Sequence, residues 1–170
     1  MDIAFSSTRS RKENDMSIFA NRFAGRTAVI TGGASGLGLE TAKRITAEGG
    51  RVALWDVNPD GLEEARQMLG TAVTQMVDVS DHAMVAAAAA QSRKALGRID
   101  ILVASAGITG ATTPVVGFPI DSWKRVMDVN LTGLFYCCRE IVPYMLENGY
   151  GRIVNVASVA GKEGNPSASA

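Results

Sequence analysis

The chain has 170 residues, enough to bury one hydrophobic core and so to form one domain. Its 17 Lys and Arg residues balance 17 Asp and Glu residues, and hydrophobic residues make up 46% of the chain. This composition argues against binding to nucleic acid or to a membrane surface, and the sequence contains no apolar run of the ~20 residues that span a bilayer.

Residues 1–22 show no apolar periodicity, and we expect them to form a disordered N-terminal tail. They lack the continuous apolar segment of a secretory signal. Transit peptides contain few acidic residues, so Asp2, Glu13 and Asp15 argue against a transit peptide. Met16 is an alternative start of the protein. We therefore expect a cytoplasmic protein whose folded part begins near residue 23.

From residue 23 to residue 170, short apolar stretches alternate with longer stretches of helical periodicity. The short stretches are rich in Val and Ile and mostly continuous, as in strands that are covered on both faces. The expected strands are Thr27–Thr31, Arg51–Trp55, Val73–Val77, Ile101–Ala104 and Arg152–Ala157, and the expected helices are Gly36–Glu48, Pro59–Leu69, Asp81–Leu96 and about Ile120–Glu147. This alternation predicts right-handed βαβ units and a doubly wound parallel sheet in a three-layer α/β/α domain.

A glycine-rich turn, Thr31-Gly32-Gly33-Ala34-Ser35-Gly36-Leu37-Gly38, joins the first strand to the first helix. Glycines let a phosphate approach the main chain, and the free N–H groups and positive dipole end of a helix attract negative charge. A glycine cluster alone is also typical of a plain tight turn. The position between strand and helix favours a pyrophosphate site.

Asp56 ends the second strand, 18 residues after Gly38. Dinucleotide sites hold the adenosine ribose with an acidic residue about 20 positions after the glycines. The plainer interpretation of Asp56 is a turn former before Asn58-Pro59. Together with the glycine turn, Asp56 indicates a dinucleotide cofactor.

Other strands also end in polar or small residues, namely Asp78, the segment Ala104-Ser105-Ala106-Gly107, and Ser158. Such residues commonly end strands for local reasons. Because ligands of doubly wound sheets bind outside the carboxyl ends of the strands, we expect these residues to gather on one rim with the glycine turn.

The spacing of Gly32, Gly36 and Gly38 after Thr31 differs from the common G-x-G-x-x-G pattern. It resembles the cofactor turn of the short-chain dehydrogenase/reductase family, and from about residue 25 the chain is similar to the first part of such a protein. The resemblance implies a Rossmann-type sheet of strand order 3-2-1-4-5. It also implies an NAD(P)-dependent oxidoreductase that interconverts a secondary alcohol and a ketone, either of the 3-oxoacyl-carrier-protein reductase type or of the sugar and polyol dehydrogenase type.

The resemblance implies cofactor contacts for single residues. The turn residues Thr31, Gly32, Ser35, Gly36, Leu37 and Gly38 match the family's cofactor turn. Asp56 implies NAD, with NADP disfavoured because a carboxylate repels a 2′-phosphate. Asp78 and Val79 match the pair that meets the adenine ring. The remaining cofactor contacts implied are Ala104, Ala106 and Gly107.

Two residues match positions of the family's catalytic site. Ser158 matches the serine that hydrogen-bonds the substrate oxygen, and Asn130 matches the asparagine that holds a water in a proton relay. A helix residue that bonds its own backbone stays an alternative for Asn130. The resemblance implies no metal ligand.

Two features depart from the family's pattern. The family usually has Asn-Asn-Ala-Gly where this chain has Ala104-Ser105-Ala106-Gly107, so the hydrogen bonds of the first asparagine are lost. The family's catalytic Tyr-x-x-x-Lys would begin just after Ala170. We therefore expect the 170 residues to be part of a longer enzyme and to turn over poorly alone, and a non-catalytic dinucleotide-binding module is the alternative.

In such a fragment the last expected strand lies at an open edge, exposing Ile153, Val154 and Val156. The resemblance implies a homotetramer for the complete protein, which associates through the last long helix. That helix carries apolar residues that are equally suited to packing within one subunit, namely Val126, Leu134, Phe135 and Ile141. The adjacent Cys137 and Cys138 suit core positions in a reducing compartment better than a disulfide or a redox role.

Overall fold

The computed structural model describes residues 18–70, 72–167 and 170. At its centre lies a five-stranded sheet of order β3-β2-β1-β4-β5, in which every neighbouring pair is parallel. The strands are β1 (Thr27–Thr31), β2 (Arg51–Asp56), β3 (Val73–Met76), β4 (Ile101–Ala104) and β5 (Arg152–Asn155). The predicted doubly wound sheet and its strand order are confirmed, although β3 and β5 end earlier than expected.

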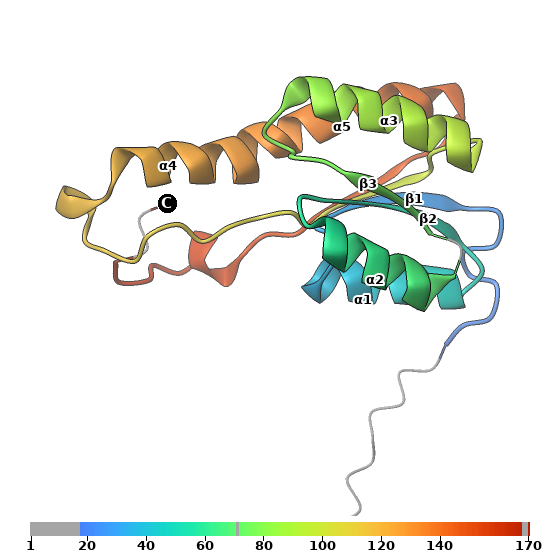
Figure 1. The fold of residues 1–170 in the computed structure, drawn as a ribbon, viewed down its shortest axis with the longest axis horizontal. Coiled ribbons are helices and arrows are strands. Elements are labelled where there is room, and N and C mark those ends of the chain that lie inside the picture. The colour runs from blue at the N-terminus through green and yellow to red at the C-terminus, as the bar shows by residue number, and fades with distance from the viewer. Residues whose placement is uncertain (1–17, 71, 168–169) are drawn as a thin grey trace, which may run out of the picture.

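Helices cover both faces of this sheet, which gives the three predicted layers (Figure 1). The helices are α1 (Gly36–Ala47), α2 (Pro59–Leu69), α3 (His82–Leu96), α4 (Ile120–Met127) and α5 (Gly133–Glu147). Helices α1 and α2 pack on one face against Ala28 and Ile30, and helices α3 and α5 pack on the other face against Val29 and Leu102. Side chains that alternate along each strand therefore supply two cores, as period-2 geometry requires.

The register of the central strands brings their carboxyl ends to one level. Thr31, the last residue of β1, lies opposite Trp55 of β2 and opposite Ala104 of β4. The segments that follow β1, β2 and β4 consequently leave the sheet side by side. This edge of the sheet is where ligands of such folds bind.

The last long helix runs from residue 120 to residue 147, but it contains a π-helical segment that the sequence did not predict. Asp128–Thr132 forms this segment between α4 and α5. A π turn inserts an extra residue, and such turns often occur at functional sites. Of the apolar residues expected on this helix, Val126 and Ile141 are buried and Leu134 packs against the core, whereas Phe135 is 57% exposed.

Part of the expected tail is packed on the domain. Residues 1–17 lie outside the described residues, but Phe19 and Arg22 both contact Glu48 at the end of α1. The Phe19 N–H donates to Glu48 Oε1 at 3.1 Å, and the Arg22 and Arg44 guanidinium groups both pair with this buried carboxylate. Burial opposes ionisation of Glu48, but these hydrogen bonds outweigh it and hold its pKa below the ordinary value. Residues 18–22, which we expected to belong to the tail, thus include hydrogen-bond partners of a buried carboxylate of the domain.

The two cysteines occupy the positions predicted for small apolar residues. Cys137 is buried in the core beneath α5, and Cys138 is half-buried; both are free thiols. Burial raises the pKa of the Cys137 thiol to about 12, so this thiol stays protonated near pH 7.

Strand β5 forms an exposed edge in the structure. Ile153 is 42% exposed, Val154 is 50% exposed, and Val156, just after the strand, is 41% exposed. This agrees with the expected open edge. Among the described residues, no helix is both long and apolar enough to cross a membrane.

Candidate cofactor site

The glycine turn after β1 packs backbone against backbone. A Cβ atom on Gly38 would lie 2.2 Å from the Gly32 carbonyl oxygen, a distance that no real Cβ contact reaches. Gly32 itself has φ +64° and lies against the main chain of Ala106 in the segment after β4. These two glycines hold the turn close to the end of β4.

Gly36 has a different environment from Gly38. Its φ is +51°, and a Cβ atom added there would meet no protein atom within 4 Å. The space beside Gly36 belongs to a cavity of about 370 Å³ at the carboxyl ends of the strands. Gly36 therefore leaves room for a ligand next to the main chain.

Helix α1 begins at this cavity with its N–H groups available. Ser35 is its N-cap residue and has an extended backbone conformation. In α1, which is described throughout, Ser35 makes no capping hydrogen bond and the first turn contains no acidic residue. Free N–H groups at the positive end of the helix dipole, without a competing carboxylate, are suited to hold an anion such as a phosphate.

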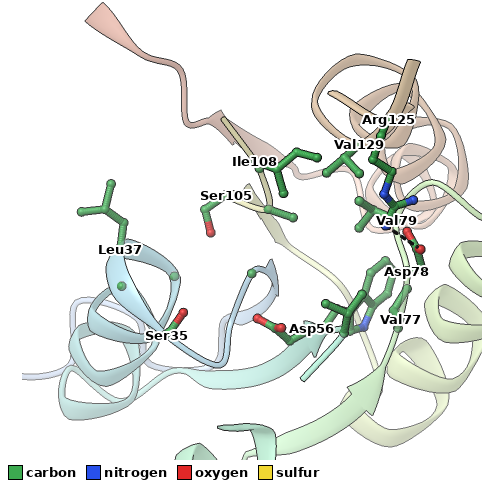
Figure 2. A pocket seen from close by; sticks show the side chains of 17 residues that line it. Ser35, Leu37, Asp56, Val77, Asp78, Val79, Ser105, Ile108, Arg125 and Val129 are labelled. Carbon is green, nitrogen blue, oxygen red and sulfur yellow. Dashed lines mark hydrogen bonds and ion pairs between the residues drawn. The ribbon is translucent and has the colours of Figure 1, made fainter. Parts of the chain in front are cut away.

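The cavity brings together most of the residues predicted to bind the cofactor (Figure 2). Those that line it are Gly32, Ser35, Gly36, Leu37, Gly38, Asp56, Asp78, Val79, Ala106 and Gly107. Thr31 and Ala104 are the other two predicted residues, and they lie behind it, lining a second cavity of about 20 Å³. Asp56, Asp78 and the segment after β4 thus lie together with the glycine turn, whereas Ser158, also expected on this rim, lines neither cavity.

Asp56 lies at the end of β2 with its carboxylate fixed from two sides. Oδ2 accepts a hydrogen bond from the Ala34 N–H in the glycine turn at 3.1 Å, and Oδ1 accepts one from the Asn58 N–H at 3.0 Å. The second bond is the local turn that was the plainer interpretation, and the first ties Asp56 to the glycine turn. Each carboxylate oxygen has two lone pairs, so both retain acceptor capacity for a ligand hydroxyl.

Asp78 lies across the cavity and is held by Ser80 and Arg125. Oδ1 accepts from the Ser80 N–H at 2.9 Å and from the Ser80 hydroxyl at 2.6 Å, and Oδ2 pairs with Arg125 Nη2 at 3.0 Å. Partial burial opposes ionisation, but these donors outweigh it and hold the pKa of Asp78 below its ordinary value. The cavity thus presents an ionised acceptor at this wall.

The segment after β4 keeps its place although it lacks the expected asparagines. Thr31 Oγ1 accepts from the N–H groups of Ser105 at 3.1 Å and of Ala106 at 3.0 Å. The Ser105 hydroxyl in turn donates to the Thr31 carbonyl oxygen. These bonds tie the ends of β1 and β4 together, so that the serine supplies a side-chain link here.

Asn130 lies in the π-helical segment and clamps the segment after β4. Its amide oxygen accepts from the Ile108 N–H and its amide nitrogen donates to the Ile108 carbonyl, both at 2.9 Å. The partner is 22 residues away in the sequence, so the expected alternative, a bond to its own helix backbone, does not describe this side chain. Asn130 also lines the small second cavity together with Val156.

Ser158 lies outside both cavities. It is exposed and caps the short 3₁₀ helix Val159–Gly161, with its hydroxyl oxygen accepting from the Ala160 N–H at 3.1 Å. The segment that carries Ser158 continues from β5, which pairs with β4 at the edge of the sheet.

A comparison with protein families decides which family this architecture represents. The family model described as short chain dehydrogenase matches residues 26–170. The chain belongs to the short chain dehydrogenase family.

Several members of this family are similar to the chain over most of its length. It is 66% identical over 155 residues to a 2-dehydro-3-deoxy-L-rhamnonate dehydrogenase (NAD(+)) of Sphingomonas sp. (strain SKA58), covering 91% of the chain and 62% of that relative. It is 36% identical to a 3-oxoacyl-[acyl-carrier-protein] reductase of Thermotoga maritima, covering 85% of the chain and 60% of that relative. An NAD+-bound xylitol dehydrogenase crystal structure superposes with a TM-score of 0.83 at 36% identity, covering 86% of the chain and 58% of the other. The chain therefore spans less than two thirds of the length of these relatives.

The short chain dehydrogenase motifs did not reveal every residue of the site. Arg125 and Ile108 line the large cavity as well, together with Trp55, Val57, Val77, Ser105 and Val129. Arg125 and Val129 are four residues apart and therefore lie on one helix face. This spacing is the signal in the sequence that could have pointed to them. That this face borders the end of β3 is a tertiary fact that the motifs do not encode. Among the described residues, no group of His, Cys, Asp and Glu is arranged to hold a metal ion.

Proposed function

We propose that this chain forms the NAD-binding part of an oxidoreductase that interconverts a secondary alcohol and a ketone. The proposal rests on one observation: a helix start that can bind an anion and a carboxylate that can accept hydrogen bonds from a ribose line the same cavity. The start of α1 attracts a pyrophosphate, and Asp56 is fixed beside it by the glycine turn. NAD accepts or supplies a hydride when it is bound, and the residues of the chain orient it.

In this proposal Asp56 selects the cofactor as well as binding it. Its carboxylate accepts hydrogen bonds from the two ribose hydroxyls with the lone pairs that Ala34 and Asn58 leave free. A 2′-phosphate at the same place meets this carboxylate and is repelled. The neighbouring cavity residue is Val57, which offers no compensating cation. The site therefore favours NAD over NADP.

We propose that the substrate reacts beside Ser158 and Asn130. The Ser158 hydroxyl is exposed and able to donate a hydrogen bond to the substrate oxygen, because its bond to Ala160 uses the oxygen as an acceptor and leaves the hydroxyl proton available. Asn130 acts by fixing Ile108 and the loop that borders the cofactor cavity. A water held near Asn130 in a proton relay belongs to the same proposal.

The substrate class that we propose is a hydroxylated sugar acid. The support is the 66% identity to a 2-dehydro-3-deoxy-L-rhamnonate dehydrogenase, compared with 36% identity to a 3-oxoacyl-[acyl-carrier-protein] reductase. A cytoplasmic homotetramer belongs to the proposal too, and the exposed Leu131 and Phe135 on the long helix are apolar side chains suited to a subunit contact.

The test is hydride transfer measured by NADH absorbance with the protein that contains this chain. With NAD+ and a 3-deoxy sugar acid, we expect turnover that Ser158→Ala reduces by at least about a hundredfold in kcat, since one oxyanion donor contributes on that order. The same substitution should leave the dissociation constant of NAD+ unchanged, because Ser158 lies outside the cofactor cavity. Tight NAD+ binding with no turnover on sugar acids, polyols or 3-oxoacyl thioesters would instead favour a non-catalytic binding module.

A further inference from the structure

Arg125 connects α4 to the loop after β3. Helix α4 extends beyond the sheet (Figure 1), and its Arg125 side chain reaches back to that loop. Nη1 donates to the Ser80 hydroxyl at 2.7 Å, and Nη2 pairs with Asp78 Oδ2 at 3.0 Å. The two bonds use the planar fork of the guanidinium group, which a single ammonium group does not reproduce.

The cavity extends beyond Asp56 to side chains that are mostly apolar, which suits an aromatic base. Figure 2 shows Asp78 and Arg125 across the cavity from Ser35 and Leu37, with Asp56 between them. If the pyrophosphate binds at α1 and the ribose at Asp56, the base of the same nucleotide extends toward Asp78. The walls there are apolar, formed by Val57, Val77, Val79 and Val129.

Asp78 is the polar group at the end of this apolar part of the cavity. Its Oδ1 accepts two hydrogen bonds from Ser80, which fill both lone pairs. Its Oδ2 accepts one bond, from Arg125, and one lone pair stays free. An exocyclic amino group of a base is the complementary donor. The direction of that free lone pair depends on where Arg125 holds the carboxylate.

We infer that Arg125 is a positioning residue of the cofactor site, which acts through Asp78 and Ser80 to aim the Asp78 carboxylate at the amino group of the adenine base. The inference rests on the proposed function. The Arg125 and Asp78 side chains are 50% and 32% exposed, so their ion pair adds little to folding stability in water. Loss of Arg125 should therefore show in ligand affinity more than in unfolding.

The experiment measures dissociation constants by titration calorimetry for NAD+, AMP and nicotinamide mononucleotide. Arg125→Ala should weaken NAD+ and AMP by the same factor, about tenfold, because the lost contact lies at the adenine end. The affinity for nicotinamide mononucleotide should not change. Arg125→Lys should recover part of the loss, since an ammonium group can reach one of the two acceptors.

Lys124→Ala is the matched control. Lys124 is the preceding residue on α4, is 67% exposed and lies 4.0 Å from Asp121. This variant should bind all three ligands as the wild type does. NAD+ and AMP affinities of Arg125→Ala within twofold of the wild type overturn the inference, and so does an equal loss for all three ligands. If the wild type itself does not bind NAD+, the proposed function fails together with the inference.

Ser80→Ala provides a second variant in case Arg125→Ala does not fold. It removes the hydroxyl that joins Arg125 Nη1 to Asp78 Oδ1 and leaves the Ser80 N–H bond in place. We expect AMP affinity to fall severalfold with nicotinamide mononucleotide unaffected. Unchanged AMP affinity in this variant overturns the inference independently.

Discussion

Two aspartates that follow neighbouring strands have different hydrogen-bond partners, which suits them to the different tasks that we propose for them. Within the part of the chain that the structure describes, the Asp56 carboxylate accepts from the main-chain N–H groups of Ala34 and Asn58 and forms no ion pair. Asp78 is paired with Arg125, so it presents an acceptor with little net charge. Uncompensated charge suits discrimination against a phosphate, and a paired carboxylate suits recognition of a neutral base.

The ion pair between Asp78 and Arg125 leads to a prediction about the free energy of unfolding at acid pH. The folded-state pKa of Asp78 is below its unfolded-state value, so its contribution to stability is complete above the unfolded pKa and is lost as pH falls through the folded pKa. We expect Asp78→Asn to lower the free energy of unfolding at pH 6 by less than about 1 kcal/mol, since the pair is partly exposed. The difference from the wild type should shrink as the pH falls below the unfolded-state pKa of about 3.9 and through the lower folded-state pKa. Urea unfolding at each pH measures it, and a difference that grows on acidification would contradict the assigned ion pair.

At the scale of elements, we propose that the glycine turn has two functions, packing and ligand binding, which belong to different glycines. Gly38 permits close packing of the turn, because a Cβ atom there would overlap the Gly32 carbonyl oxygen. Gly36 faces the cavity and has open space around its α-carbon. The sequence motif does not distinguish Gly36 from Gly38. Their different surroundings in the structure do.

Alanine substitutions should separate these two functions. Gly38→Ala should destabilise the fold by several kcal/mol, because the clash is with main chain that cannot give way. Gly36→Ala should cost only about 1 kcal/mol of stability, from the left-handed backbone conformation, yet weaken NAD+ binding by at least about tenfold as its methyl group enters the cavity. Urea unfolding and calorimetry measure the two effects. A Gly36→Ala variant with wild-type affinity for NAD+ would show that the ligand does not approach this main chain.

The helical elements show where sequence patterns stop being informative. The long helix was predictable from its periodicity, but its π-helical segment was not, since the pattern does not mark the extra residue. Asn130 lies in that segment and contacts Ile108 from there. The hydrogen bonds between Asn130 and Ile108 thus depend on tertiary structure. So does the contact between Arg125 and Asp78, which are 47 residues apart.

For the whole molecule, the alternation of strands and helices was enough to predict the sheet and its rim. Asp56, which ends β2, and Asp78, two residues after β3, line one cavity as expected because the ends of parallel strands meet at one edge, whereas Ser158 does not line it. The packing of residues 18–22 on the end of α1 was not predicted. Arg22 contacts Glu48 there, although residues 18–22 have no apolar periodicity. The sequence indicated only that the hydrogen bonds of the family's first asparagine are lost, and it did not predict the bond from the Ser105 hydroxyl to the Thr31 carbonyl oxygen.

The central claim is that this rim binds NAD and disfavours NADP through Asp56. Titration calorimetry of the protein with NAD+ and with NADP+, repeated on Asp56→Ala, tests it most directly. We predict that NAD+ binds at least about tenfold more tightly than NADP+, and that Asp56→Ala weakens NAD+ and removes most of that preference. Equal affinity of the wild type for both dinucleotides, or a preference that survives in Asp56→Ala, would contradict the claim.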